Sequence, residues 1–160
     1  MKNRKSIFIF FIFIIILLIS YMILKENHSK DVYSNQSFGL QNDLVQLEGS
    51  IDYQIKNGWN DVDSVIEKIE DIREDINRLM VLGKDLGLIT SQQEDDLWNL
   101  DKYFSNYPTY SGYPNTILDN NEIDKLTQLQ EDLRSAGWGM NIGYSSGWTS
   151  FSKKIDELID

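Results

Sequence analysis

The sequence contains no cysteine, only one histidine and only two prolines in 160 residues. Without cysteine, no disulfide can stabilise the fold and no lipid anchor can be attached to a thiol. The lone His28 excludes tetrahedral zinc sites and Ser-His or Cys-His nucleophile systems. Gly83–Gly87 (GKDLG) has the composition of a helix terminator, not that of a phosphate loop. The sequence therefore predicts no metal and no cofactor, and we do not expect an enzyme.

Charge is absent from one long stretch near the N-terminus. The segment from Ile7 to Leu24 holds 15 Ile, Leu and Phe residues together with one Met, one Tyr and one Ser. Its 18 residues would rise about 27 Å as a helix, close to the roughly 30 Å hydrocarbon thickness of a bilayer. A helix that is apolar on every face at this length is typical of a transmembrane anchor in contact with lipid.

The charges on either side of this run predict its orientation. Lys2, Arg4 and Lys5 precede it, whereas Lys25 and Lys30 after it are offset by Glu26. The positive-inside rule then places the N-terminus in the cytoplasm. No pair of small residues follows the run to form a cleavage site, which favours a single-pass anchor that stays in the cell membrane; the alternative is secretion after cleavage. The expected parts are a basic cytoplasmic tail (1–6), the anchor (7–24), a polar tether without helical periodicity (25–37) and an extracytoplasmic domain (38–160).

The part of the chain outside the membrane is strongly acidic. From Asp31 onward it carries 24 acidic and 10 basic residues, a formal charge of −14. Such a surface repels the phosphate backbone, so nucleic acid is excluded as a partner, and basic proteins are favoured. The missing cysteines and the abundance of Ile and Asn favour a bacterial cell envelope.

Apolar periodicity predicts an all-α fold with four to five helices in a small bundle. Leu40, Leu44, Leu47 and Ile51 indicate a first bundle helix over about 38–56. A second helix carries a heptad stripe, widened by neighbouring apolar residues, that consists of Val62, Val65, Ile69, Ile72, Ile76 and Leu79. This stripe suits packing against more than one helix, and it offers a surface for a protein partner or for self-association.

The connection between these helices has two interpretations. Gly58 followed by Asn60 fits a tight hairpin in which Gly58 ends one helix and Asn60 caps the next. A single long helix with a four-residue stutter also fits. Further along, Ser91–Glu94 and Thr90–Gln93 are overlapping capping boxes for a third helix, a fourth helix starts near Asp119–Glu122 and stops at Gly137, and a last helix is capped at Thr149.

Aromatic residues gather in two glycine-containing loops, and they are the candidate ligand or partner surface. The residues singled out are Tyr107, Tyr110 and Tyr113 in the first loop, and Trp138, Tyr144 and Trp148 in the second. Amphipathic rings on loops are typical of sugar-stacking and peptide-binding surfaces. The competing interpretation is that both loops fold back and cover the end of the core.

These features predict a membrane-anchored, extracytoplasmic, non-enzymatic module that interacts with another protein of the cell envelope. The alternative is a domain that binds cell-wall glycan or peptide through the Tyr/Trp loops. Exposure and proximity of the rings distinguish a binding surface from a cover over the end of the core.

Overall fold

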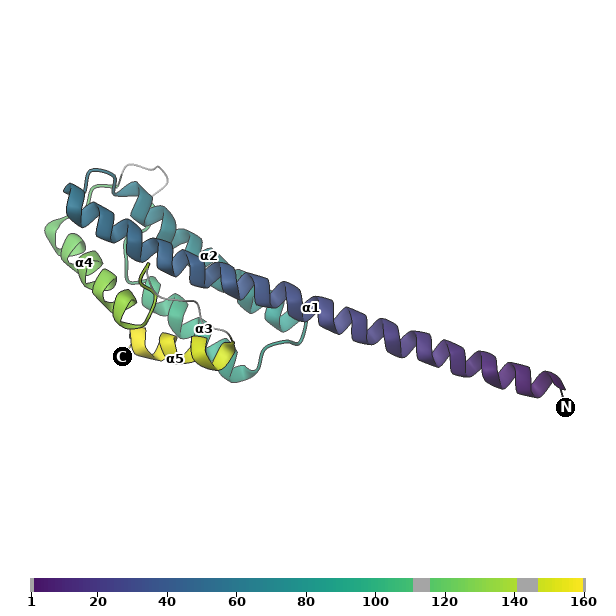
Figure 1. Ribbon diagram of the computed structural model, residues 1–160. Helices are drawn as coiled ribbons and strands as arrows, with labels where there is room; N and C mark the ends of the chain where they lie inside the picture. Colours follow the sequence, from purple (N-terminus) through teal and green to yellow (C-terminus); the bar gives the residue numbers. More distant parts are fainter. Residues whose placement is uncertain (1, 111–115, 141–146, 160) are drawn as a thin grey trace.

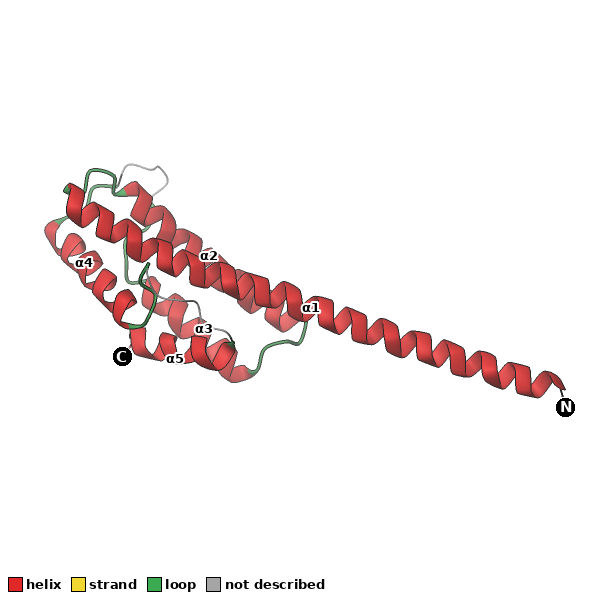
Figure 2. Ribbon diagram, in the orientation of Figure 1, coloured by secondary structure: helices red, strands yellow, loops and turns green. Residues whose placement is uncertain are grey.

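The computed structural model describes residues 2–110, 116–140 and 147–159, apart from the side chains of 2–9, 11, 29–32 and 35. That part of the chain contains five helices and no strand (Figure 2), so the all-α prediction is confirmed. The helices are α1 (Lys2–Asn57), α2 (Asp63–Asp85), α3 (Ser91–Phe104), α4 (Asn120–Ser135) and α5 (Trp148–Ile159).

The first helix is much longer than predicted. α1 runs unbroken over 56 residues and includes the whole segment 25–37, for which we expected an irregular tether. That expectation is wrong because this segment contains no Pro and no Gly to end a helix. Ending the helix there would leave backbone N–H and C=O groups without intrahelical partners at two new termini, whereas continuing it leaves none.

The N-terminal part of α1 lies apart from the other helices (Figure 1). Twelve large apolar side chains between Phe10 and Leu24 are exposed there, each by 42% to 68%. Among the described residues, no helix has a stretch that meets the length and hydropathy needed to cross a membrane. The predicted anchor also includes residues 7–9 and 11, whose side chains lie outside the description.

The C-terminal half of α1 is built into a bundle. It packs against α2 on one side and α4 on another, α3 packs between α2 and α5, and α4 meets α5 (Figure 1). The predicted stripe of Leu40, Leu44, Leu47 and Ile51 is fully buried. The part of the heptad stripe that lies in α2 is also buried within the bundle, since Val65, Ile69, Ile72, Ile76 and Leu79 are all 0% exposed.

The connection between α1 and α2 is a hairpin. Gly58 and Trp59 both adopt left-handed backbone, with φ of 76° and 57°, and the Trp59 N–H donates to the carbonyl of Gln54 at 3.0 Å. The predicted cap at Asn60 is wrong. The residue before α2 is Val62, which makes no side-chain cap, and the Asn60 amide instead donates to the Asn57 carbonyl at 2.6 Å.

Two later helix starts are fixed by reciprocal capping boxes. Thr90 with Gln93 caps the start of α3, one residue before the other predicted pair, Ser91–Glu94. Asp119 with Glu122 caps the start of α4. Gly137, with φ of 89°, follows the end of α4 as predicted. Thr149 is not a cap, because α5 already begins at Trp148.

Candidate functional site

Tyr107 of the first aromatic loop packs onto the end of α3. Tyr107 is half-buried, its ring lies 6.2 Å from that of Phe104, and its hydroxyl donates to the Tyr103 hydroxyl at 3.0 Å. Burial raises the pKa of both tyrosines above the ordinary value of 10.0. Tyr107 and Tyr103 therefore stay neutral, and they extend the core over the end of α3.

Tyr110 fastens the same loop to the start of α2. Its hydroxyl donates to the Asp63 carbonyl at 2.7 Å, and its N–H donates to the Glu70 carboxylate at 2.8 Å. The Thr116 N–H donates to the Asp63 carboxylate at 3.1 Å. Tyr110 is thus engaged by the chain itself. Tyr113 and Tyr144, the other two tyrosines singled out, lie outside the described residues.

Trp138 is a core residue, so for this ring the interpretation as part of the core applies and the interpretation as a binding surface does not. It is 0% exposed, its ring meets Phe151 edge to face at 6.1 Å, and the Lys154 ammonium lies 5.7 Å from the ring centre. The chain turns inward here because Gly137 takes left-handed backbone directly after α4.

Trp148 is half-buried and is held by a buried carboxylate. Its indole N–H donates to Asp96 at 3.1 Å, and the Ser152 hydroxyl donates to the same carboxylate oxygen at 2.7 Å. The ring stacks beside Tyr33 of α1 at 6.2 Å and meets Phe151 edge to face at 5.3 Å. Asp96 is only 5% exposed, so these contacts join α3 to α5 and fix the orientation of the indole.

Two described rings of the aromatic segments, those of Tyr110 and Trp148, lie far apart. Tyr110 contacts the start of α2 at the hairpin end, whereas Trp148 contacts Tyr33 near the apolar part of α1 (Figure 1). Tyr33 and the hairpin residue Asn57 are separated by 24 residues of one continuous helix, a rise of about 36 Å. The rings therefore do not form one shared site.

A pocket of about 590 Å³ opens beside Trp148. Its walls come from α1, the α2–α3 connection and the starts of α3 and α5. The lining residues are Tyr33, Ser34, Ser37, Phe38, Gln41, Leu88, Gln93, Gly147, Trp148 and Phe151. We call it the Trp148 pocket. Its volume lies in the range of small-ligand and side-chain sites. Of the residues predicted as a binding surface, Trp148 is the one that this pocket contains.

The α1 side of this pocket, including Tyr33, was not predicted from the sequence. Tyr33 is 9% exposed and lies seven residues before Leu40, so it continues the apolar stripe of the first bundle helix by one heptad. That spacing was the available signal. The polar residues around Tyr33 concealed it.

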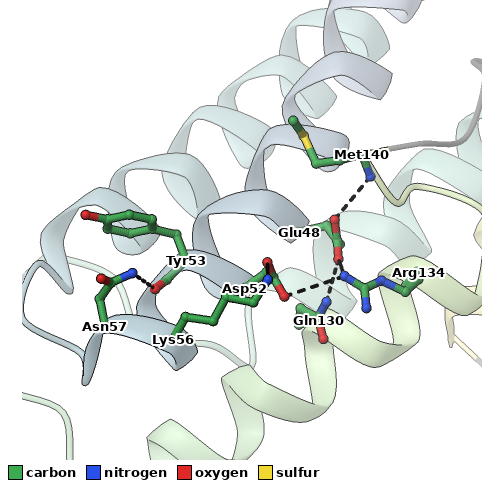
Figure 3. Close-up of polar contacts among 8 residues, drawn as sticks. All are labelled: Glu48, Asp52, Tyr53, Lys56, Asn57, Gln130, Arg134 and Met140. Atoms are coloured by element: carbon green, nitrogen blue, oxygen red, sulfur yellow. Dashed lines mark hydrogen bonds and ion pairs between the residues drawn. The ribbon is translucent and has the colours of Figure 1, made fainter.

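A buried carboxylate joins α1 to α4 (Figure 3). Glu48 is 1% exposed and accepts hydrogen bonds from Gln130 at 2.5 Å, Arg134 at 2.5 Å and the Met140 N–H at 3.2 Å. Asp52 lies 3.7 Å from the same guanidinium. Because three donors of the chain surround its carboxylate, Glu48 holds α1, α4 and the segment at Met140 together.

The contact between α1 and α2 contains a pair of close carboxyl groups. Burial raises the pKa of Asp43 above its ordinary value of 3.8, and neighbouring Asp75 and Asp71 act in the same direction. Lys68, whose ammonium is 4.0 Å away, opposes them. No group of three His, Cys, Asp or Glu side chains within the described ranges is arranged to hold a metal ion.

Comparison with protein-family models, with curated proteins and with solved structures finds no match to this chain.

Replacing Arg134 with Met should destabilise the bundle by about 1–3 kcal/mol, because Glu48 would remain buried without its cation. Lys153→Met is the matched control, since Lys153 pairs with Glu157 at the surface and should cost less than about 1 kcal/mol. Chemical denaturation measures both. Equal losses for the two variants would contradict the assignment.

Asp43→Asn should stabilise the protein at neutral pH. A raised pKa means that the folded state binds the proton more tightly than the unfolded state. The resulting stability is fully present below the unfolded pKa near 4 and is lost as the pH rises through the higher folded pKa. The amide removes that loss, so the gain should shrink toward pH 3. Denaturation at several pH values measures it, with the exposed Asp156→Asn as control; a gain that does not depend on pH would refute the cause given.

Proposed function

We propose that this chain is a single-pass membrane protein whose helical bundle lies outside the cytoplasm and acts as a non-enzymatic interaction module for another protein of the cell envelope. The observation that carries the proposal is the contrast along α1. One part of this helix exposes apolar side chains, and the other part is the central packing element of the bundle.

The exposed part of α1 supports the anchoring. The five consecutive residues Ile15–Ile19 are each more than half exposed, and successive helical positions turn by about 100°, so every face of the helix is apolar there. No other element covers them in Figure 1. Leaving such a surface in water is unfavourable by roughly 25 cal/mol per Å², whereas lipid accepts it on all sides.

The charges around the apolar run support the orientation. Lys2, Arg4 and Lys5 before it favour retention of the N-terminus in the cytoplasm. The bundle, with its formal charge of −14 from Asp31 onward, would then face the cell exterior. Because α1 continues into the bundle without a break, its orientation also fixes which end of the bundle faces the membrane.

The contacts of the buried carboxylates support a binding role over a catalytic one. Glu48 and Asp96 each accept hydrogen bonds from the chain's own donors, and both connect helices. The function then resides in what the outer surface contacts. The second candidate, a domain that binds cell-wall glycan or peptide through the Tyr/Trp loops, is supported by Trp148 at its pocket. Tyr107 contacts Tyr103 of α3, and Tyr110 contacts the start of α2, so neither ring lines that pocket.

Cell fractionation tests the proposal. The full-length chain should sediment with membranes and resist extraction by salt, and protease added to cells without their wall should digest the bundle. A double variant Ile15→Lys, Leu18→Lys adds about 5–7 kcal/mol to the insertion free energy and should release the protein from the membrane.

The matched control for that variant is Val81→Lys with Leu86→Lys, which places two charges at exposed apolar positions of the bundle and should leave sedimentation unchanged. Recovery of the intact wild-type chain in the soluble cytosolic fraction would overturn the anchoring. Recovery of one discrete partner after surface crosslinking supports the interaction role, and a bundle that stays unlinked in its own membranes contradicts it.

A further inference from the structure

The Trp148 pocket is uncharged in a chain where charge is abundant. None of its ten lining residues is Asp, Glu, Lys or Arg, although these make up 25% of the sequence. Its walls combine aromatic and aliphatic side chains with the neutral polar Ser34, Ser37 and Gln41. A group that enters this pocket is therefore uncharged and largely apolar, with room for a few hydrogen bonds.

One wall of the pocket carries an unsatisfied polar atom. Tyr33 is 9% exposed, and its hydroxyl is enclosed without a hydrogen-bond partner among the described residues. Burial also raises the pKa of this hydroxyl, so it remains a neutral donor and acceptor. Leaving a buried hydroxyl unpaired is unfavourable. The residue therefore forms a wall of the pocket with its ring, while its hydroxyl stays enclosed behind that wall.

The rim of the pocket presents an accessible ring. Phe38 lines the pocket and is 50% exposed, and the half-buried Trp148 is held rigidly by Asp96. Ordered aromatic rings around a concave, partly dry site are typical of the places where a partner's side chain contributes most of the binding energy.

We propose that the Trp148 pocket binds a short uncharged segment of a partner polypeptide, rich in aromatic and aliphatic residues and flanked by basic ones. The basic flanking residues are inferred from the net charge of the bundle, since the chain from Asp31 onward holds 24 acidic and 10 basic residues. Positive residues beside the inserted segment complement that surface and speed its association. This inference rests on the proposed interaction role and assigns it a site.

The position of the pocket along α1 favours a polypeptide over a lipid chain. Tyr33 lies nine residues after Leu24, the last residue of the apolar run, which corresponds to a rise of about 14 Å. The headgroup layer on each side of a bilayer is only about 5–8 Å thick. A lipid tail would have to cross water to reach the pocket, whereas the membrane-proximal segment of a neighbouring protein is already at that height.

Peptide binding to the full-length protein in phosphatidylcholine nanodiscs tests the site. The probe is a fluorescent peptide with a Leu-Phe-Leu centre and two lysines on each side, measured by anisotropy. Phe38→Ala should weaken its binding by about 5- to 30-fold. Val81→Ala is the matched control, since Val81 is likewise 50% exposed and lies outside the pocket, and it should change nothing.

Tyr33→Phe is a second control, because it removes the enclosed hydroxyl and keeps the ring that lines the pocket. This variant should keep or raise the thermal stability and leave peptide binding unchanged. Binding that is equal in Phe38→Ala and Val81→Ala, or absent in the wild type, would overturn the site.

Two changes to the probe peptide, and competition with two other ligands, test whether something other than a polypeptide occupies the pocket. Glutamates in place of the lysines should weaken binding by at least tenfold, and a Ser-Gly-Ser centre should abolish it. If a short-chain phosphatidylcholine or a cell-wall saccharide fills the pocket and the peptide does not compete, the polypeptide assignment is wrong. Failure of the chain to enter nanodiscs while it still binds the peptide would contradict the proposed anchoring and leave the pocket intact.

Discussion

The continuity of α1 is the constraint on which the other features depend. A helix of 56 residues places an apolar stretch and the packing stripe of the bundle on one rod. Tyr33, Leu40, Leu44 and Ile51 recur on the same side of that rod, so the bundle helices are arranged around its second half. Because both parts belong to one helix, the orientation of the apolar part also sets the orientation of the bundle. Any ligand that binds near Tyr33 does so at the end of the bundle closest to that part (Figure 1).

The helices around α1 are joined by two buried carboxylates as well as by apolar packing. Glu48 connects α1 with α4 and with the segment at Met140, and Asp96 connects α3 with the first residues of α5. Buried charges are costly unless donors surround them, and here each carboxylate accepts at least three hydrogen bonds. The two carboxylates fix the positions of the short helices, and Asp96 also orients Trp148, which forms one wall of the pocket.

Much of the bundle could be predicted because it follows local rules. Helix period located the buried faces of α1 and α2, Gly58 indicated the hairpin, and the capping pair Asp119–Glu122 marked the start of α4. The continuation of α1 through 25–37 was missed because polar residues dominate that segment, although it contains no Pro or Gly and Tyr33 continues the apolar stripe. Glu48 and Asp96 were missed because burial of a carboxylate depends on donors distant in sequence; a charged residue between Leu44 and Ile51 on the buried face was the only local sign. Trp138 and Trp148 looked alike in sequence, and only tertiary packing separates the core ring from the pocket ring.

A distance measurement along α1 tests the central claim, that one rigid helix joins the apolar stretch to the bundle. The sequence contains no cysteine, so His28→Cys with Tyr53→Cys gives two unique sites for spin labels, both at exposed positions. The two residues are 25 positions apart, which corresponds to about 38 Å of helix. Pulsed electron–electron resonance on the full-length protein in nanodiscs should give one narrow distribution near that distance. A broad distribution centred at shorter distances would show a flexible joint between the two parts and would contradict the account.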